Sequence, residues 1–167
     1  MTAAATDLSR RAFFRGGARR PAPVRPPWAM AGLLTELCTR CGRCEAACPE
    51  GIIAAGDGGF PEVEFGRGEC SFCGACAEAC PAGLFAPRDL APWHLQVTVA
   101  EGCIARSVVC RSCADACPER ALSFPRVVGG GAPTVNADAC TGCGACVSAC
   151  PVRAVSITPT RRQEAAA

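Results

Sequence analysis

Residues 140–151 read CTGCGACVSACP, in which four cysteines are separated by two, two and three residues and the last is followed by proline. The same run occurs at 38–49 and at 70–81, and a run with a first gap of six residues occurs at 103–118. The last cysteines of runs one and three lie 117 − 48 = 69 positions apart, and those of runs two and four lie 150 − 80 = 70 positions apart. Two pairs of runs at an almost constant offset indicate a duplicated unit.

The spacing Cys-x2-Cys-x2-Cys-x3-Cys-Pro is the pattern of bacterial ferredoxins, in which each unit holds two 4Fe–4S clusters. Two-residue gaps allow one loop to place three thiolates at three corners of a cube, and the fourth cysteine reaches the other cluster of the pair. Gly42, Gly74 and Gly144 follow the second cysteine of three runs, where a residue without Cβ lets the backbone wrap closely around a cluster. The sixteen cysteines are therefore predicted to bind four 4Fe–4S clusters.

This rule uses every cysteine once. Cluster one takes Cys38, Cys41, Cys44 and Cys80. Cluster two takes Cys70, Cys73, Cys76 and Cys48. Cluster three takes Cys103, Cys110, Cys113 and Cys150. Cluster four takes Cys140, Cys143, Cys146 and Cys117.

Two other uses of so many cysteines fit less well. A disulfide framework requires an oxidising compartment and a signal peptide. Zinc sites use Cys-x2-Cys pairs, but rarely three cysteines at two-residue spacing followed by Cys-Pro. His94, the only histidine, is expected to be structural because cysteine supplies every predicted metal site. No Ser/His/Asp or paired-carboxylate constellation indicates an enzyme, and sparse aromatic residues argue against nucleic-acid binding.

The predicted fold is α+β, with two tandem ferredoxin-like modules behind an extended basic N-terminal arm. The arm is placed at 1–32, module 1 at 33–90, module 2 at 91–159 and a flexible tail at 160–167. Pro87 and Pro92 bracket the break between the modules. Apolar pieces predict four short strands, at Ile52–Ala55, Val63–Phe65, Gln96–Ala100 and Val155–Thr158. Gly56–Gly59 and Gly129–Ala132 predict turns, and a short helix is expected after each third cysteine, as at Ala77–Ala79.

Charge is distributed unevenly along the chain. Residues 1–30 carry six arginines and one acid, or +5, whereas residues 31–167 carry eleven arginines and fourteen acids, or −3. Four clusters at −2 each would add about −8. Arg40 and Arg43 lie within run one and Arg111 within run three, where they either raise the potential of a neighbouring cluster or simply face solvent.

The segment SRRAFFR at 9–15 resembles a twin-arginine export motif. Export signals continue with an apolar stretch, whereas this chain continues GGARRP at 16–21. No uncharged apolar run is long enough to span a membrane. We therefore expect the protein to remain in the cytoplasm.

Several pieces, some within the cysteine runs and some outside them, carry a resemblance to a known family. They are Ser9-Arg10-Arg11, Arg25-Pro26-Pro27-Trp28, Cys38-Thr39-Arg40-Cys41, Glu69-Cys70-Ser71-Phe72-Cys73, Leu84-Phe85-Ala86-Pro87-Arg88, Cys103, Ser107-Val108 and Cys140-Thr141-Gly142-Cys143-Gly144-Ala145-Cys146. With these pieces the chain resembles, over nearly its whole length, the NapF family of ferredoxin-type accessory proteins of bacterial periplasmic nitrate reductase systems.

The resemblance implies a cytoplasmic iron–sulfur protein that binds the catalytic molybdenum subunit before its export and assists its maturation. Residues 1–30 are then a candidate docking segment. The residues themselves leave two alternatives open, namely an electron carrier that passes single electrons to a redox partner and a structural metal protein. Cluster spacing argues against the structural alternative, and only the resemblance favours the accessory role over the carrier.

Overall fold

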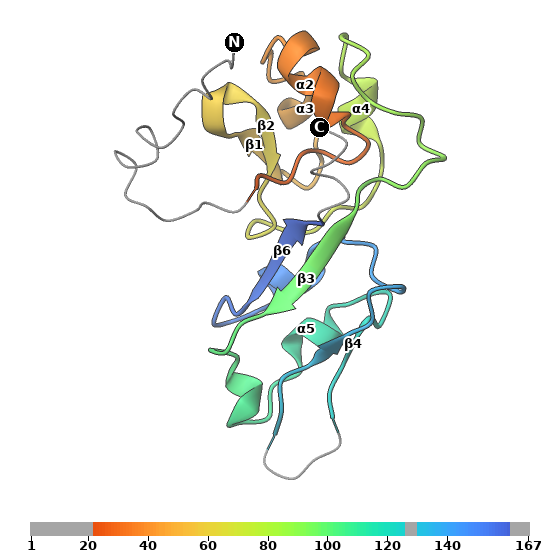
Figure 1. The fold of residues 1–167 in the computed structure, drawn as a ribbon. Coiled ribbons are helices and arrows are strands. Elements are labelled where there is room, and N and C mark those ends of the chain that lie inside the picture. Colours follow the sequence, from red (N-terminus) through yellow and green to blue (C-terminus); the bar gives the residue numbers. More distant parts are fainter. Residues whose placement is uncertain (1–21, 126–129, 161–167) are drawn as a thin grey trace, which may run out of the picture.

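The structure, a computed structural model, describes residues 22–125 and 130–160. Residues 1–21 of the predicted arm, the predicted tail beyond residue 160 and the first residue of the predicted turn Gly129–Ala132 lie outside this part. The elements, mixed helix and strand, are shown in Figure 1. They are α2 (Ala31–Leu37), α3 (Arg43–Ala46), β1 (Ile53–Ala55), β2 (Pro61–Val63), α4 (Ala75–Glu78), β3 (Leu95–Val99), α5 (Ser112–Asp115), β4 (Leu122–Ser123), β5 (Thr134–Val135), α6 (Ala145–Ser148) and β6 (Val155–Pro159), with 3-10 turns at Asp57–Gly59 and Ile104–Arg106.

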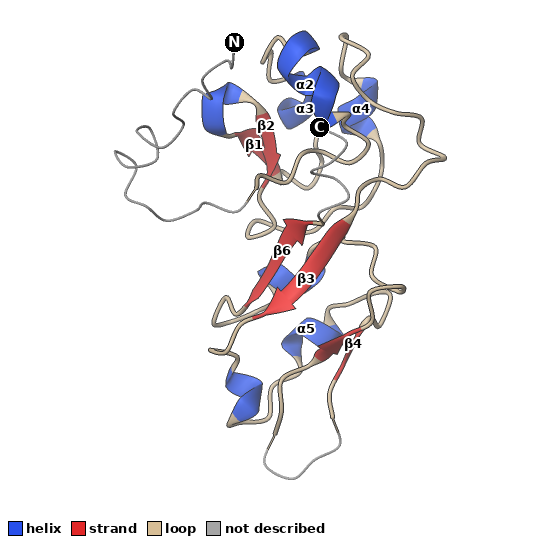
Figure 2. Ribbon diagram, viewed as in Figure 1, coloured by secondary structure: helices blue, strands red, loops and turns tan. Residues whose placement is uncertain are grey.

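Both halves of the molecule place an antiparallel strand pair between their two cysteine runs. In the first half β1 pairs with β2, with Ile53 opposite Val63, and in the second half β4 pairs with β5, with Leu122 opposite Val135. The second half adds the β3–β6 ladder, which joins its beginning to its end and lies between α2–α4 and the α5–β4 region in Figures 1 and 2. Two tandem ferredoxin-like modules are thus recognisable in the topology.

The β3–β6 ladder follows from the alternation in the sequence LQVTV. Leu95, Val97 and Val99 are half-buried, whereas Gln96 and Thr98 face solvent, as period-two alternation on one covered sheet face requires. The Thr98 hydroxyl lies 2.7 Å from the hydroxyl of its cross-strand partner Ser156. In the described part of the first half, the isolated bridge between Ala29 and Phe85 is the counterpart to this ladder.

The predicted strands are found with small shifts, except at Val63–Phe65. There the strand occupies Pro61–Val63, because the Gly56 N–H donates to the Phe60 carbonyl (2.8 Å) and closes the turn early. Phe65 leaves the strand and is buried in the core. The strands β4 and β5, of two residues each, and the helix α2 were not predicted.

Four short helices each contain the third cysteine of a run, so they begin earlier than the sequence predicted. In three of them a glycine with left-handed backbone precedes the helix: Gly42 (φ 73°), Gly74 (φ 79°) and Gly144 (φ 92°). A residue without Cβ adopts this conformation at little cost. In run three Arg111 stands at this place with φ −131°, and a 3-10 turn at Ile104–Arg106 takes up the longer gap.

The described end of the predicted arm is packed against the first half. Val24 and Trp28 are 8% and 7% exposed, and Pro26 and Pro27 are buried between them. The Val63 N–H donates to the Val24 carbonyl (2.8 Å), so that residue 24 lies alongside β2. The packed body therefore begins before residue 32, where the sequence placed the end of the arm.

The apolar core is built around cysteines in both halves. One cluster combines first-half residues such as Ile52, Val63 and Phe65 with Trp93, and the other contains Cys113, Leu122, Cys146 and Val155. Val147 packs against both clusters, which makes the core continuous between the halves. Among the described residues, no helix has the length and apolar character needed to cross a membrane.

Candidate metal centres

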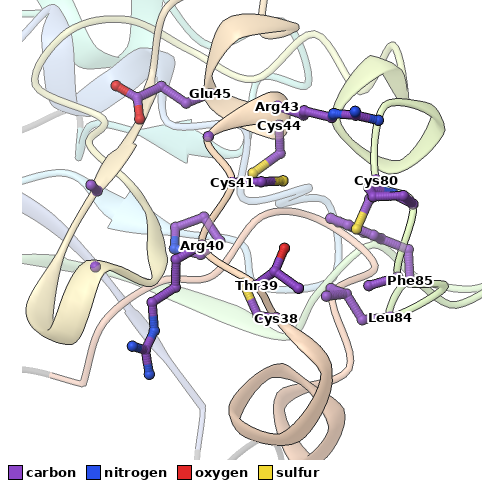
Figure 3. A pocket seen from close by; sticks show the side chains of 16 residues that line it. Cys38, Thr39, Arg40, Cys41, Arg43, Cys44, Glu45, Cys80, Leu84 and Phe85 are labelled. Carbon is purple, nitrogen blue, oxygen red and sulfur yellow. The ribbon is translucent and has the colours of Figure 1, made fainter.

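The first cavity contains the four cysteines predicted for cluster one. Cys38 follows α2, Cys44 lies in α3, and Cys80 follows α4, while Cys41 lies between the first two. All four line one cavity of about 80 Å³, which is shown in Figure 3. Three of its thiols thus come from run one and the fourth from run two.

Two further cavities gather the cysteines predicted for clusters two and four. One is lined by Cys48, Cys70, Cys73 and Cys76. The other is lined by Cys117, Cys140, Cys143 and Cys146. In both, as in the first cavity, the fourth cysteine of one run joins three cysteines of the partner run.

Of the quartet predicted for cluster three, Cys103 and Cys110 lie close enough to Cys113 for their charges to act on its thiol. Burial raises the pKa of Cys113, and the charges of Cys103 and Cys110 add to this effect. Cys150 packs against the same apolar cluster as Cys113. Within residues 22–125 and 130–160, no group of His, Cys, Asp and Glu converges tightly enough to hold one metal ion. The quartets predicted for clusters one, two and four surround cavities instead.

Three of the thiols in these cavities, Cys70, Cys76 and Cys146, are hard to ionise because they are buried. Burial, with neighbouring thiols adding to it, raises the pKa of Cys76 and Cys146 to about 12, and burial raises the pKa of Cys70 to about 11. A thiol must lose its proton to bind a metal, and the cations of a bound cluster supply the charge that stabilises the buried thiolates. Quartets of cysteine sulfurs around small cavities therefore fit iron–sulfur clusters in both number and chemistry.

Cys41 differs from the buried ligands because it is exposed. The backbone N–H of Arg43 and the Thr39 side chain lower the pKa of the Cys41 thiol, and the charge of Arg43 contributes as well. Figure 3 shows the Arg40 guanidinium pointing away from the cysteine sulfurs, and it lies 4.5 Å from the ring centre of Phe60. Of the two arginines in run one, Arg43 is the one that lowers the pKa of a predicted ligand, Cys41.

Arg111 in run three also has partners other than a cysteine. Its guanidinium carbon lies 5.4 Å from the ring centre of Phe124, and its Nε lies 3.9 Å from the Asp115 carboxylate. All three arginines are exposed, and they differ in what they contact. Arg40 and Arg111 stack on rings, whereas Arg43 lies beside a thiol.

Backbone N–H groups donate to cysteine sulfurs, as the predicted wrapping of the chain requires. Phe72 donates to Cys70 (3.4 Å), Ala121 to Cys117 (3.3 Å) and Ala154 to Cys150 (3.2 Å). Hydrogen bonds of this kind stabilise a thiolate and are one of the factors that set the potential of a bound cluster.

Two tryptophans for which the sequence predicted no structural role each donate a hydrogen bond to a loop carbonyl. Trp28 and Trp93 each lie ten positions before the first cysteine of a pair of runs, since 38 − 28 and 103 − 93 both equal 10. The Trp28 indole N–H donates to the Leu90 carbonyl and that of Trp93 to the Thr141 carbonyl, both at 2.9 Å. Their common offset from the cysteines was the signal available in the sequence.

Paired cysteine runs, three cavities in which the fourth cysteine of one run joins three cysteines of the partner run, and a strand pair between the runs define a ferredoxin-type iron–sulfur protein. The 4Fe-4S dicluster domain family matches residues 37–84 and again residues 106–154. Two dicluster domains hold four 4Fe–4S clusters, which agrees with sixteen cysteines.

Curated relatives agree with this class. A ferredoxin-type protein NapF of Haemophilus influenzae is 44% identical over 144 residues, covering 84% of this chain and 82% of the relative. The ferredoxin-type protein NapF of Escherichia coli K12 is 45% identical over 143 residues, covering 83% of this chain and 87% of the relative. The chain therefore belongs to the family of ferredoxin-type NapF proteins.

Proposed function

We propose that this protein is an iron–sulfur accessory factor that assists maturation of the catalytic molybdenum subunit of the periplasmic nitrate reductase. It acts in the cytoplasm, on the precursor of that subunit, before export. The observation that carries the proposal is the identity of 44–45% to ferredoxin-type NapF proteins over most of the chain. The segment Arg-Pro-Pro-Trp at 25–28 also resembles the NapF family, and it is packed against the first half of the molecule.

In this proposal the four quartets predicted from the sequence hold the four clusters. Support comes from the three cavities that each gather one complete quartet. When bound, 4Fe–4S clusters accept and donate single electrons. The chain contributes thiolates, N–H donors to the sulfurs and an apolar core that restricts water, and it performs no catalysis of its own.

A second candidate function is that of an electron carrier for a redox partner. It is favoured by the exposure of Cys41 and Cys73, which brings predicted ligands of sites one and two to the surface. A redox partner that approaches such an exposed ligand closely could exchange electrons with the cluster bound there, as a carrier requires. The accessory role remains our proposal because the family relationship supports it.

A deletion strain separates the two functions. If the protein is a maturation factor, the catalytic subunit purified from this strain will be inactive or deficient in its cofactors. Expression of the intact chain will restore the activity of the catalytic subunit, whereas expression of a chain with Cys76 and Cys146 replaced by serine will not. Fully active purified subunit, combined with slow electron supply in the cells, would instead establish the carrier and refute the maturation role.

A further inference from the structure

The two halves of the molecule meet through their second and fourth cysteine runs. The backbone N–H of Cys70 donates to the carbonyl of Cys143 at 2.7 Å, although these residues are far apart in the sequence. Cys70 lines the second cavity and Cys143 lines the fourth site's cavity. Among the hydrogen bonds of the described residues, this is the one that joins a cysteine run of one half to a cysteine run of the other.

Three aromatic side chains, Phe65, Phe72 and Trp93, pack together beside this contact. Phe72, between two cysteines of run two, lies edge-on to Trp93, with ring centres 5.6 Å apart. Phe65 also lies edge-on to Trp93, at 5.8 Å. The Trp93 indole N–H donates to the carbonyl of Thr141, which follows the first cysteine of run four. Trp93 therefore contacts run two through its ring and run four through its hydrogen bond.

Two glycines of run four allow the halves to approach so closely. A Cβ added to Gly144 would overlap the Phe65 ring, and a Cβ added to Gly142 would lie 2.8 Å from Nε1 of Trp93. The corresponding glycine of run one, Gly42, has open space around the same position. Gly42 and Gly144 share the left-handed conformation. They differ in their surroundings, because only Gly144 lies against a residue near the junction between the halves, Phe65.

Packing is continuous across the same junction. Val147 in α6 and Ile157 in β6 pack against the first-half cluster that contains Ile52, Val63 and Cys76. The described contacts thus place site two and site four next to each other. Sites one and three are each attached to this pair through the cysteine exchange within their own half.

We propose that the halves are coupled through sites two and four, so that the clusters follow the spatial order one, two, four, three and not the order of the runs in the sequence. Trp93, Gly142 and Gly144 are the positioning residues of this coupling. The inference depends on the four-cluster content and on the ligand quartets, and it does not depend on the maturation role.

The test uses the full-length protein, purified without oxygen and chemically reduced, with Cys41→Ser and Cys110→Ser to remove one ligand each from sites one and three. Iron and sulfide analysis verifies that two clusters remain. We expect the EPR spectrum of the reduced protein to show spin–spin interaction between them. The complementary protein, with Cys73→Ser and Cys117→Ser, will show two isolated signals.

Gly144→Ala and Gly42→Ala form a matched pair in the same background. Both place a side chain on a left-handed residue, but only Gly144→Ala forces Phe65 away from run four. Gly144→Ala will abolish the spin–spin interaction, and Gly42→Ala will leave it intact. Isolated signals in the protein that retains sites two and four, or interaction in the protein that retains sites one and three, would overturn the proposal.

A second measurement needs no ligand substitution. In the intact four-cluster protein the Cys70 amide will exchange slowly with deuterium, because it is bonded to Cys143. Gly144→Ala will accelerate this exchange at least tenfold and Gly42→Ala will not. Rapid exchange of the Cys70 amide in the intact protein would also refute the proposed junction.

Discussion

The backbone N–H of Ala154 donates to Sγ of Cys150 at 3.2 Å, and the residue before it, Arg153, has left-handed backbone with φ 52°. The left-handed turn aims the following N–H at the sulfur. In the first half Gly83, with φ 64°, occupies the corresponding position three residues after Cys80. Both halves therefore make the same turn, but the second half makes it with a residue that carries a Cβ.

Arg153→Gly is predicted to stabilise the protein. Left-handed backbone costs a residue with a Cβ about 1–2 kcal/mol, and the greater freedom of glycine in the unfolded chain offsets about 0.5–1 kcal/mol of this. A net gain of about 0.5–1 kcal/mol will appear as a higher guanidinium midpoint, measured without oxygen from cluster absorbance. Gly83→Ala is the reverse control, since its Cβ would meet no atom within 4 Å. A lower midpoint for Arg153→Gly would contradict the assigned strain.

Trp28 is predicted to be a structural anchor of the segment that precedes α2. Trp28 is 7% exposed, and its indole N–H donates to the Leu90 carbonyl. Trp28→Phe removes the hydrogen bond and will cost about 1 kcal/mol, whereas Trp28→Ala removes the ring as well and will cost about 3–5 kcal/mol. Leu90→Ala, at a side chain that is 55% exposed, is the control and will have little effect.

The same unfolding assay measures all three variants. Equal and small losses for Trp28→Ala and Leu90→Ala would show that residues 22–30 do not belong to the packed body.

Cysteine reactivity in cluster-free protein is predicted to follow exposure and thiol pKa. Cys41 is exposed and its pKa is lowered, whereas Cys76 and Cys146 are buried and stay protonated until pH approaches their pKa of about 12. Because the thiolate is the nucleophile, Cys41 will react with iodoacetamide at least tenfold faster than either buried cysteine at pH 8. Peptide mass spectrometry gives the three rates.

Protein unfolded in guanidinium is the control for that experiment, since all three cysteines will react at similar rates once the fold is lost. Similar rates in the folded, cluster-free protein would contradict the described burial.

Arg43 and Arg40 are predicted to differ in their effect on cluster one. A cation beside a cluster stabilises the reduced, more negative state, so Arg43→Gln will lower the potential of that cluster, by on the order of 30 mV for a partly solvated charge. Arg40→Gln will change it less, because the Arg40 guanidinium stacks on Phe60. Redox titration followed by EPR measures both. A larger change of the cluster-one potential in Arg40→Gln than in Arg43→Gln would show that Arg40, not Arg43, is the arginine that tunes the cluster.

Three of the predicted cysteine quartets each line one cavity, and they could be predicted because the spacing within a run is a local property of the chain. A run of fifteen residues or fewer contains three of the four cysteines predicted for one cluster, and the duplication shows which runs are paired. The strands at β1, β3 and β6 were predictable for a similar reason, since their apolar residues are contiguous or alternate. The strand predicted at Val63–Phe65 is shifted to Pro61–Val63. The hydrogen bond between the Gly56 N–H and the Phe60 carbonyl closes the turn earlier than the composition suggests.

The junction between the halves could not be predicted in this way. It depends on Cys70 meeting Cys143 and on Trp93 meeting both Phe72 and Thr141, which are contacts between segments far apart in sequence. The packing of Val24 and Trp28 was hidden for the same reason, since a proline-rich segment with arginines has the composition of a solvated arm.

The binding of four 4Fe–4S clusters by sixteen cysteines is tested most directly by the metal and sulfide content of protein purified without oxygen. We expect about sixteen irons and about sixteen acid-labile sulfides for each chain, with EPR signals that appear on reduction. Zinc bound without acid-labile sulfide would contradict this expectation.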